Sequence, residues 1–203
     1  MSTYADLQDR ISLDYLNRTD LLPEVKRAIK NAIRTHESSR YWFNEASTAI
    51  AASSGQTFIT IPADFLSLDR VEITQSSQDY KLSQRDFNWL RDMRVARTQG
   101  LPTDFNYYRD RLELFPIPDS AYSIIVYYVA SLATLSADSD TNAWTNEASN
   151  LIAHEATVDL LANVVQASPD RIQRQALLRS LALQELQSRN YSRISFRLKP
   201  TAF

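Results

Sequence analysis

Few residues in this sequence have the types and spacing that catalysis or metal binding requires. There are two histidines, His36 and His154, and no cysteine, so a zinc site would need carboxylates to complete its ligand set. Glu155 follows His154, but position 158 holds valine where the helical motif of zinc proteases needs a second histidine. Because His154 shares a helical stripe with Leu151 and Val158, we interpret it as a core or interface histidine.

The carboxylates offer a second route to chemistry. Asp138 and Asp140 are spaced to bind a hard cation, but the residues around them lack the rest of an EF-hand loop and favour a solvated loop. Hydrolysis by two carboxylates needs them roughly 5–10 Å apart, a distance that the sequence does not give. A serine–histidine–aspartate triad fits the composition, but the G-x-S-x-G elbow is missing. A carboxylate-dependent hydrolase stays open as an alternative function.

Glycine is scarce, which removes whole classes of nucleotide-binding protein. The sequence holds only Gly55 and Gly100. A phosphate-binding loop or a dinucleotide fingerprint needs several closely spaced glycines, because the backbone must approach the phosphates. We therefore expect neither kind of site, and no cofactor.

The composition is that of an ordinary globular protein. The 203 residues are 44% hydrophobic and 23% charged, and the formal net charge is −2, so no overall basic field marks a nucleic-acid-binding protein. The polar N-terminus has no apolar signal segment, and no apolar run approaches the roughly 20 residues that span a bilayer. We expect a soluble cytoplasmic product without a membrane partner.

Helical patterns occupy both ends of the chain. Thr3 is placed to cap a first helix that reaches Leu16, and Pro23 lies in the first turn of a second helix that ends near His36. Asn142 is placed to cap a long helix over 143–167, which is apolar on more than one side. Ser168 and Pro169 then begin a last helix that ends near Asn190.

The middle of the chain has strand patterns. Arg111–Phe115 alternates polar and apolar residues, which predicts a half-buried strand. Residues 122–129 are apolar on both faces, which predicts an inner strand covered on both sides. Residues 105–108 are a candidate third strand. Residues 47–51 and 57–61 read as a hairpin around Gly55, and residues 83–94 as a short helix.

These patterns predict an α+β fold. We expect a helical bundle body made by residues 1–43 and 142–192, a β-rich insert over 44–135, and an extended C-terminal tail over 193–203.

The last two helices segregate charge and carry a second apolar stripe. Residues 138–170 contain acids but no lysine or arginine, and residues 171–199 are strongly basic. An acidic helix and a basic helix can pair within one chain as an antiparallel hairpin. They can instead join one subunit to the next, because head-to-tail contacts that close form a ring. The candidate interface residues are Glu147, Glu155, Asp159, Arg171, Arg174, Leu177, Leu178 and Leu181.

The C-terminal tail alternates basic or polar residues with apolar ones and has no nearby segment to pair with. One interpretation is a frayed terminus. The interpretation we prefer is a segment that becomes ordered on a partner protein. The candidate binding residues are Arg193, Ile194, Phe196, Arg197, Leu198, Lys199 and Phe203.

An ordered set of motifs resembles the head-to-tail (portal) adaptor proteins of short-tailed bacteriophages, also called tail accessory factors. The motifs cover most of the chain, and no single one is specific. An opening helix over 4–16 and the strand entry Ile61-Pro62-Ala63-Asp64-Phe65-Leu66 come first. The remaining matches are Gly100, Pro102, Leu112, Leu114, Pro116, Pro118, Asp119, Tyr122, Tyr127, Tyr128, Leu135, Ser136 and Asn142.

The resemblance implies a structural virion protein, not an enzyme. Similar adaptors form a homo-oligomeric ring, typically dodecameric, under the portal protein, and their C-terminal segment inserts between portal subunits. Such a ring, assembled in the host cytoplasm, extends the DNA channel without sequence-specific binding and gives the tail nozzle protein its attachment platform. The alternatives are a tail-associated hydrolase that acts on the cell wall through a carboxylate pair, and a DNA-binding module.

Overall fold

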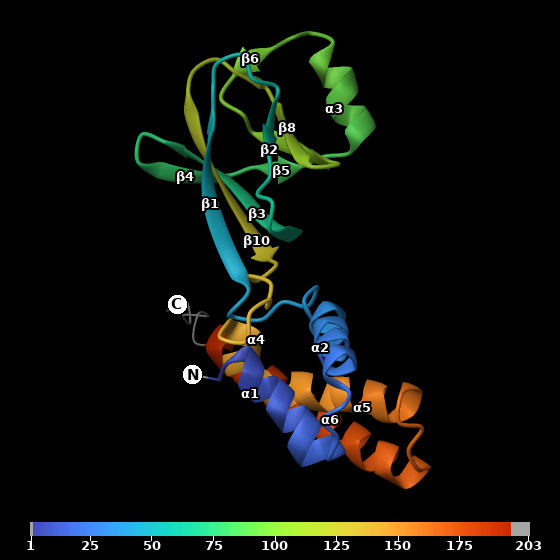
Figure 1. Cartoon of the computed structure of the whole chain (residues 1–203). Coiled ribbons are helices and arrows are strands. Elements are labelled where there is room, and N and C mark those ends of the chain that lie inside the picture. Colours follow the sequence, from blue (N-terminus) through green and yellow to red (C-terminus); the bar gives the residue numbers. More distant parts are fainter. Residues whose placement is uncertain (1, 196–203) are drawn as a thin grey trace. The chain divides into compact units, whose positions relative to one another are not determined.

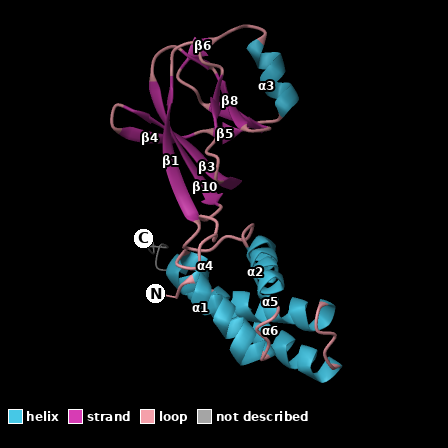
Figure 2. Ribbon diagram, in the orientation of Figure 1, coloured by secondary structure: helices cyan, strands magenta, loops and turns pink. Residues whose placement is uncertain are grey.

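The computed structural model describes the backbone of residues 2–195 and the side chains of residues 2–193. The chain divides into two compact units, one made by residues 1–44 and 132–203 and the other by residues 45–131 (Figure 1). The first is helical and the second is mostly strands (Figure 2), so the α+β class is confirmed. Residues 132–135, expected in the β-rich insert, group with the helical unit, where Leu135 is buried.

The helical unit begins where the sequence predicts. The Thr3 hydroxyl accepts a hydrogen bond from the Asp6 N–H at 3.1 Å, and the Asp6 carboxylate accepts one from the Thr3 N–H at 2.7 Å. This reciprocal capping box satisfies two donors that the helix itself leaves free. The helices of this unit are α1 Tyr4–Asp9, the π-helix η1 Arg10–Leu16, α2 Leu22–His36, α4 Ala143–Asn146, α5 Ser149–Asn163 and α6 Pro169–Ser195.

The single helix expected over 143–167 is wrong, because α4 and α5 are separate. Asn142 does cap α4, and its side chain accepts hydrogen bonds from two backbone N–H groups. The helix is then interrupted at Glu147, whose carbonyl accepts a hydrogen bond from Arg189 Nη1 at 3.0 Å. The α5 helix ends at Asn163, before Gln166, which has a left-handed backbone with φ of 51°.

The core of the helical unit forms around α5 and Trp144. The α5 helix packs on η1, α2 and α6, and it is buried on several sides, as predicted. The Trp144 ring is 1% exposed and makes edge contacts with Tyr41 at 5.8 Å and Phe43 at 5.1 Å between ring centroids. Aromatic edge contacts add to the free energy gained by burial. Both ends of the chain therefore contribute to one core.

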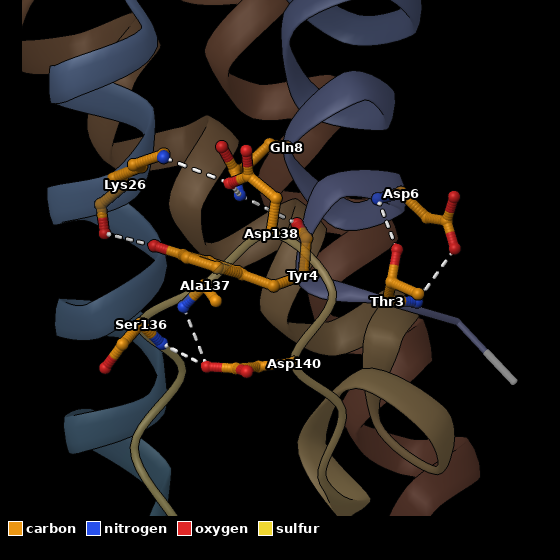
Figure 3. A network of polar contacts seen from close by, with 9 residues as sticks. All are labelled: Thr3, Tyr4, Asp6, Gln8, Lys26, Ser136, Ala137, Asp138 and Asp140. Atoms are coloured by element: carbon orange, nitrogen blue, oxygen red, sulfur yellow. Dashed lines mark hydrogen bonds and ion pairs between the residues drawn. The ribbon is translucent and has the colours of Figure 1, made fainter.

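An acidic loop fastens the N-terminal helix to this core (Figure 3). Asp140 accepts hydrogen bonds from the N–H groups of Ser136 and Ala137 at 2.7 and 2.8 Å, so its carboxylate closes the loop on itself. The backbone carbonyl of Asp140 accepts from the Tyr4 N–H at 2.8 Å, and that of Asp138 from the Ala5 N–H at 2.9 Å. Two donors in the first turn of α1, which lack partners within the helix, are thus satisfied by the loop.

The Asp138 side chain reaches two helices from this loop. It accepts hydrogen bonds from Lys26 Nζ on α2 at 3.1 Å and Gln8 Nε2 on α1 at 3.3 Å (Figure 3). These contacts hold the pKa of Asp138 below its ordinary value, because the Lys26 and Gln8 hydrogen bonds favour the charged form. Asp138 and Asp140 are therefore structural residues of the loop.

The β unit has two four-stranded sheets with one shared core. The sheet orders are β1-β10-β3-β4 and β2-β8-β7-β5, and β6 pairs with β9. Buried residues from both sheets, such as Val71, Val126, Ile59 and Leu112, lie in one cluster. The elements are β1 Glu45–Ala52, β2 Phe58–Thr60, β3 Phe65–Gln75, β4 Gln78–Lys81, β5 Ser83–Gln84, α3 Phe87–Arg94, β6 Gln99–Gly100, β7 Asp104–Tyr108, β8 Arg111–Phe115, β9 Ile117–Pro118 and β10 Tyr122–Ala130.

Two predictions for this unit are wrong in detail. The hairpin around Gly55 does not form, because β1 pairs with β10 while β2 pairs with β8 in the other sheet. The strand β8 is not half-buried, because α3 packs on its second face. Glu113, predicted to face water, is 4% exposed and accepts from Arg94 Nη1 on α3 at 2.9 Å. The predicted inner strand β10 does lie between β1 and β3.

We predict that Trp144→Ala destabilises the helical unit by about 3–5 kcal/mol, because it removes a fully buried ring and leaves a cavity. Urea unfolding followed by helical circular dichroism measures this change. Tyr191→Ala is the control, since Tyr191 is 72% exposed and should change stability by no more than about 0.5 kcal/mol. Equal midpoints for the two variants would contradict the assignment of Trp144 to the core.

We also predict that Asp140→Asn lowers the stability of the helical unit at pH 7. The backbone N–H bonds from Ser136 and Ala137 hold the pKa of Asp140 below its ordinary value of 3.8. A lowered folded-state pKa stabilises the fold above the unfolded-state pKa, and this contribution is lost as the pH falls through the folded-state pKa. The difference between wild type and variant should therefore shrink below about pH 4.

Urea unfolding at pH 7 and at pH 3 tests this expectation. Asp9→Asn, at an exposed position on α1, is the control and should change stability at pH 7 by no more than about 0.5 kcal/mol. A stability difference between wild type and Asp140→Asn that is the same at both pH values would refute the role of the carboxylate charge.

Candidate functional site on helix α6

The α6 helix has a covered side and an open side. Leu186 on the covered side is 3% exposed, and Ile172 and Leu183 pack beside it against the helical core. The open side carries Leu177, Leu178 and Leu181, which are 61%, 37% and 51% exposed. The prediction of two opposite apolar stripes is confirmed. We call the open side, with the exposed Arg174, the α6 outer face.

The α6 outer face carries adjacent exposed leucines. Leu177 and Leu181 are four residues apart, and Leu178 and Leu181 are three apart, so their side chains are neighbours on the helix surface. Single exposed leucines are ordinary, whereas adjacent ones form an apolar patch that loses water favourably when a partner covers it.

Two acids of the candidate interface already have partners inside the chain. The Glu155 carboxylate lies 3.2 Å from His36 Nε2 and 3.3 Å from Arg179 Nη1. The hydrogen bond from His36 is the largest cause of a lowered pKa for Glu155, and burial opposes it. Glu147 pairs with Arg189. Glu147, which precedes α5, and Glu155 on α5 thus pair with arginines of α6 within one chain, as the interpretation of an antiparallel hairpin predicts.

Asp159 and Arg174 are different, since neither takes part in an ion pair among residues 2–193. Asp159 accepts a hydrogen bond from Asn163 Nδ2 at 2.6 Å. It lines a groove of about 210 Å³ between α2 and α5, whose other lining residues are Ala28, Asn31, Ala32, Thr35 and Glu155. Arg174 lies on the α6 outer face. These two residues leave unpaired charges of opposite sign on two separate surfaces.

Arg171 has a structural role within the chain. Its Nη2 donates to the Tyr15 carbonyl at 2.6 Å, at the end of η1. The last carbonyls of a helix have no partner within the helix, and an arginine side chain commonly satisfies them. The contact joins the start of α6 to the N-terminal segment of the chain.

The C-terminal end of α6 is fastened by Trp42, which the sequence analysis missed. The guanidinium groups of Arg189 and Arg193 lie 5.0 and 4.6 Å from the centre of the Trp42 ring, a favourable cation–π geometry. Asn190 accepts from the Trp42 N–H at 3.1 Å and donates to the Arg40 carbonyl at 3.1 Å. The available signal was the spacing of Arg189, Asn190 and Arg193, which places them on one side of a helix.

The predicted tail boundary is therefore wrong. Residues 193–195 belong to α6, and Arg193 contacts Trp42 within the chain. Ile194 is helical, and its side chain is not described. The other candidate binding residues lie outside the described residues: Phe196, Arg197, Leu198, Lys199 and Phe203.

His154, the histidine that the sequence analysis considered for metal binding or catalysis, packs against other side chains. His154 is 8% exposed, stacks on Tyr15 at 5.1 Å between centroids, and its Nδ1 lies 3.0 Å from Gln175 Oε1. Burial lowers the pKa of His154, and its low exposure agrees with the core alternative of the predicted core or interface histidine. Among the described residues, no three or more histidine, cysteine or acidic side chains are grouped to hold a metal ion.

No described helix is long and apolar enough to cross a membrane.

Comparison with known proteins identifies the family. No curated protein matches the chain. The family model described as SU10 adaptor protein matches residues 2–197, which is nearly all of the 203 residues and agrees with the adaptor resemblance in the sequence. The chain therefore belongs to the SU10 adaptor protein family.

Proposed function

We propose that this protein is a structural adaptor of a short-tailed phage. Copies form a ring, dodecameric by analogy with similar adaptors, below the portal at the head–tail junction of the virion. The ring extends the DNA channel and gives the tail nozzle protein its attachment platform. The family match supports an adaptor role, and the exposed leucines of the α6 outer face are the observation that carries the assembly.

Self-association follows from the apolar surface that one chain leaves open. Burying apolar side chains against another copy stabilises a complex by roughly 25 cal/mol for each Å² of apolar surface removed from water. Leu177 and Leu181 are more than half exposed in the single chain, so most of this free energy is still available for a contact.

Portal attachment is assigned to the chain after α6. Residues 196–203 contain Phe196, Leu198 and Phe203 between basic and polar residues, a pattern that suits an extended segment docked on a partner. Trp42 holds the helix end that precedes this segment through Arg189 and Arg193. A fixed base limits the conformational entropy that the segment loses on binding.

The charge balance suits a channel through which DNA passes. A protein that neutralises many phosphates binds DNA tightly, because each contact releases counterions. The net charge of −2 gives little general attraction for phosphates, which favours passage of the genome over its capture.

We predict that truncation after Ser195 abolishes portal binding and leaves the fold intact. The truncation keeps α6 and the Arg193–Trp42 contact and removes only residues 196–203. Co-sedimentation with portal rings measures binding, and circular dichroism with urea unfolding checks the fold.

Two matched full-length variants separate apolar from charged contributions. Replacing Phe196, Leu198 and Phe203 by serine should reproduce the loss, because the docking side chains are removed. Replacing Arg197 and Lys199 by glutamine should weaken binding less, and mainly at low salt. Portal binding by the truncated protein at full-length affinity would reject this attachment.

A further inference from the structure

We propose that the α6 outer face of one copy docks in the α2/α5 groove of the next copy, with Arg174 paired to Asp159 of that copy. The proposal rests on the proposed ring and names the two surfaces that form it. The occupant of the groove is thus a second copy of this chain.

The groove between α2 and α5 is lined by small and polar side chains. Its volume is about 210 Å³, and it lies between two helices of the unit. Ala28 and Ala32 contribute only methyl groups, so an incoming helix can approach closely. Side chains three and four residues apart form a ridge that packs into the groove between neighbouring helices. Leu177, Leu178 and Leu181 form such a ridge.

The charges of the two surfaces are complementary. Asp159 and Glu155 line the groove, and Glu155 already has His36 and Arg179 as partners. Neither Asp159 in the groove nor Arg174 on the α6 outer face forms an ion pair among the described residues. A charge pair at the edge of an apolar contact sets register and partner choice more than affinity. Pairing Arg174 of one copy with Asp159 of the next gives each charge a partner of opposite sign.

The two surfaces share no residue, and this decides the type of assembly. A contact between two copies through the same surface would form a closed dimer, whereas a contact between two different surfaces continues from copy to copy. The groove is made by α2 and α5 and the ridge by α6. Each copy therefore offers one groove and one ridge, and the contacts form a closed ring when the rotation from one copy to the next closes on itself.

Charge reversal on either surface tests the pairing. Asp159→Lys places two cations in the contact, and Arg174→Asp places two anions there, so each variant alone should assemble on portal rings at least about tenfold more weakly. In a ring that alternates the two variants, every contact again joins one cation to one anion. A 1:1 mixture, and the variant with both substitutions, should therefore assemble like the wild type. Native mass spectrometry of portal particles counts the bound copies.

A steric variant tests the groove without changing its charge. Thr35 is exposed and lines the groove, while its exposed neighbour Arg34 does not. Thr35→Trp should reduce the number of copies on the portal, and Arg34→Trp should not. Urea unfolding checks that each charge variant and each tryptophan variant is folded.

The outcomes distinguish this inference from the proposed function. Wild-type protein that fails to form rings on the portal would overturn the ring itself. Complete wild-type rings, together with full assembly of both single charge variants and of Thr35→Trp, would overturn only the pairing of groove and ridge. Single variants that assemble poorly but are not rescued by mixing would also overturn the Arg174–Asp159 pair.

Discussion

The helical unit depends on burying α5 and Trp144 between segments from opposite ends of the chain. Residues 2–44 supply η1, α2 and the aromatic side chains around Trp144, and the C-terminal part supplies α5 and α6. The α5 helix is buried on several sides, because η1 and α2 from one end of the chain and α6 from the other pack on it. The acidic loop over 136–140 secures the arrangement by binding both α1 and α2 through Asp138.

This core also explains which surface is left for assembly. The α6 helix uses one side to cover α5 and has no further element of the described chain to cover its other side. Glu155 on α5 pairs with Arg179 on α6 within the chain, whereas Asp159 on α5 and Arg174 on α6 form no ion pair among the described residues. The covered side of α6 stabilises the single chain, and the α6 outer face still has apolar surface whose burial would stabilise a contact with another protein.

In the β unit, the alternation of polar and apolar residues along a strand does not predict which residues are buried. Arg111–Phe115 alternates polar and apolar residues and does form a strand, but α3 covers the face on which Glu113 lies. A buried carboxylate is tolerated there because Arg94 neutralises it, and burial in turn lowers the pKa of Arg94 while Glu113 opposes that change. The pattern alone gave no sign of the covering helix.

The helix starts at Thr3 and Asn142, the two stripes of α6 and the strands of the middle segment are predictable from local sequence, because caps and periodicity act between near neighbours in the chain. Which charges are paired, and where α6 ends, depends on contacts between distant segments. His36 and Glu155 meet across 119 positions, and Trp42 holds Arg193 from the other end of the chain. Tertiary packing determines which distant residues meet, because the free energy of a charge or of an apolar face depends on the groups that cover it.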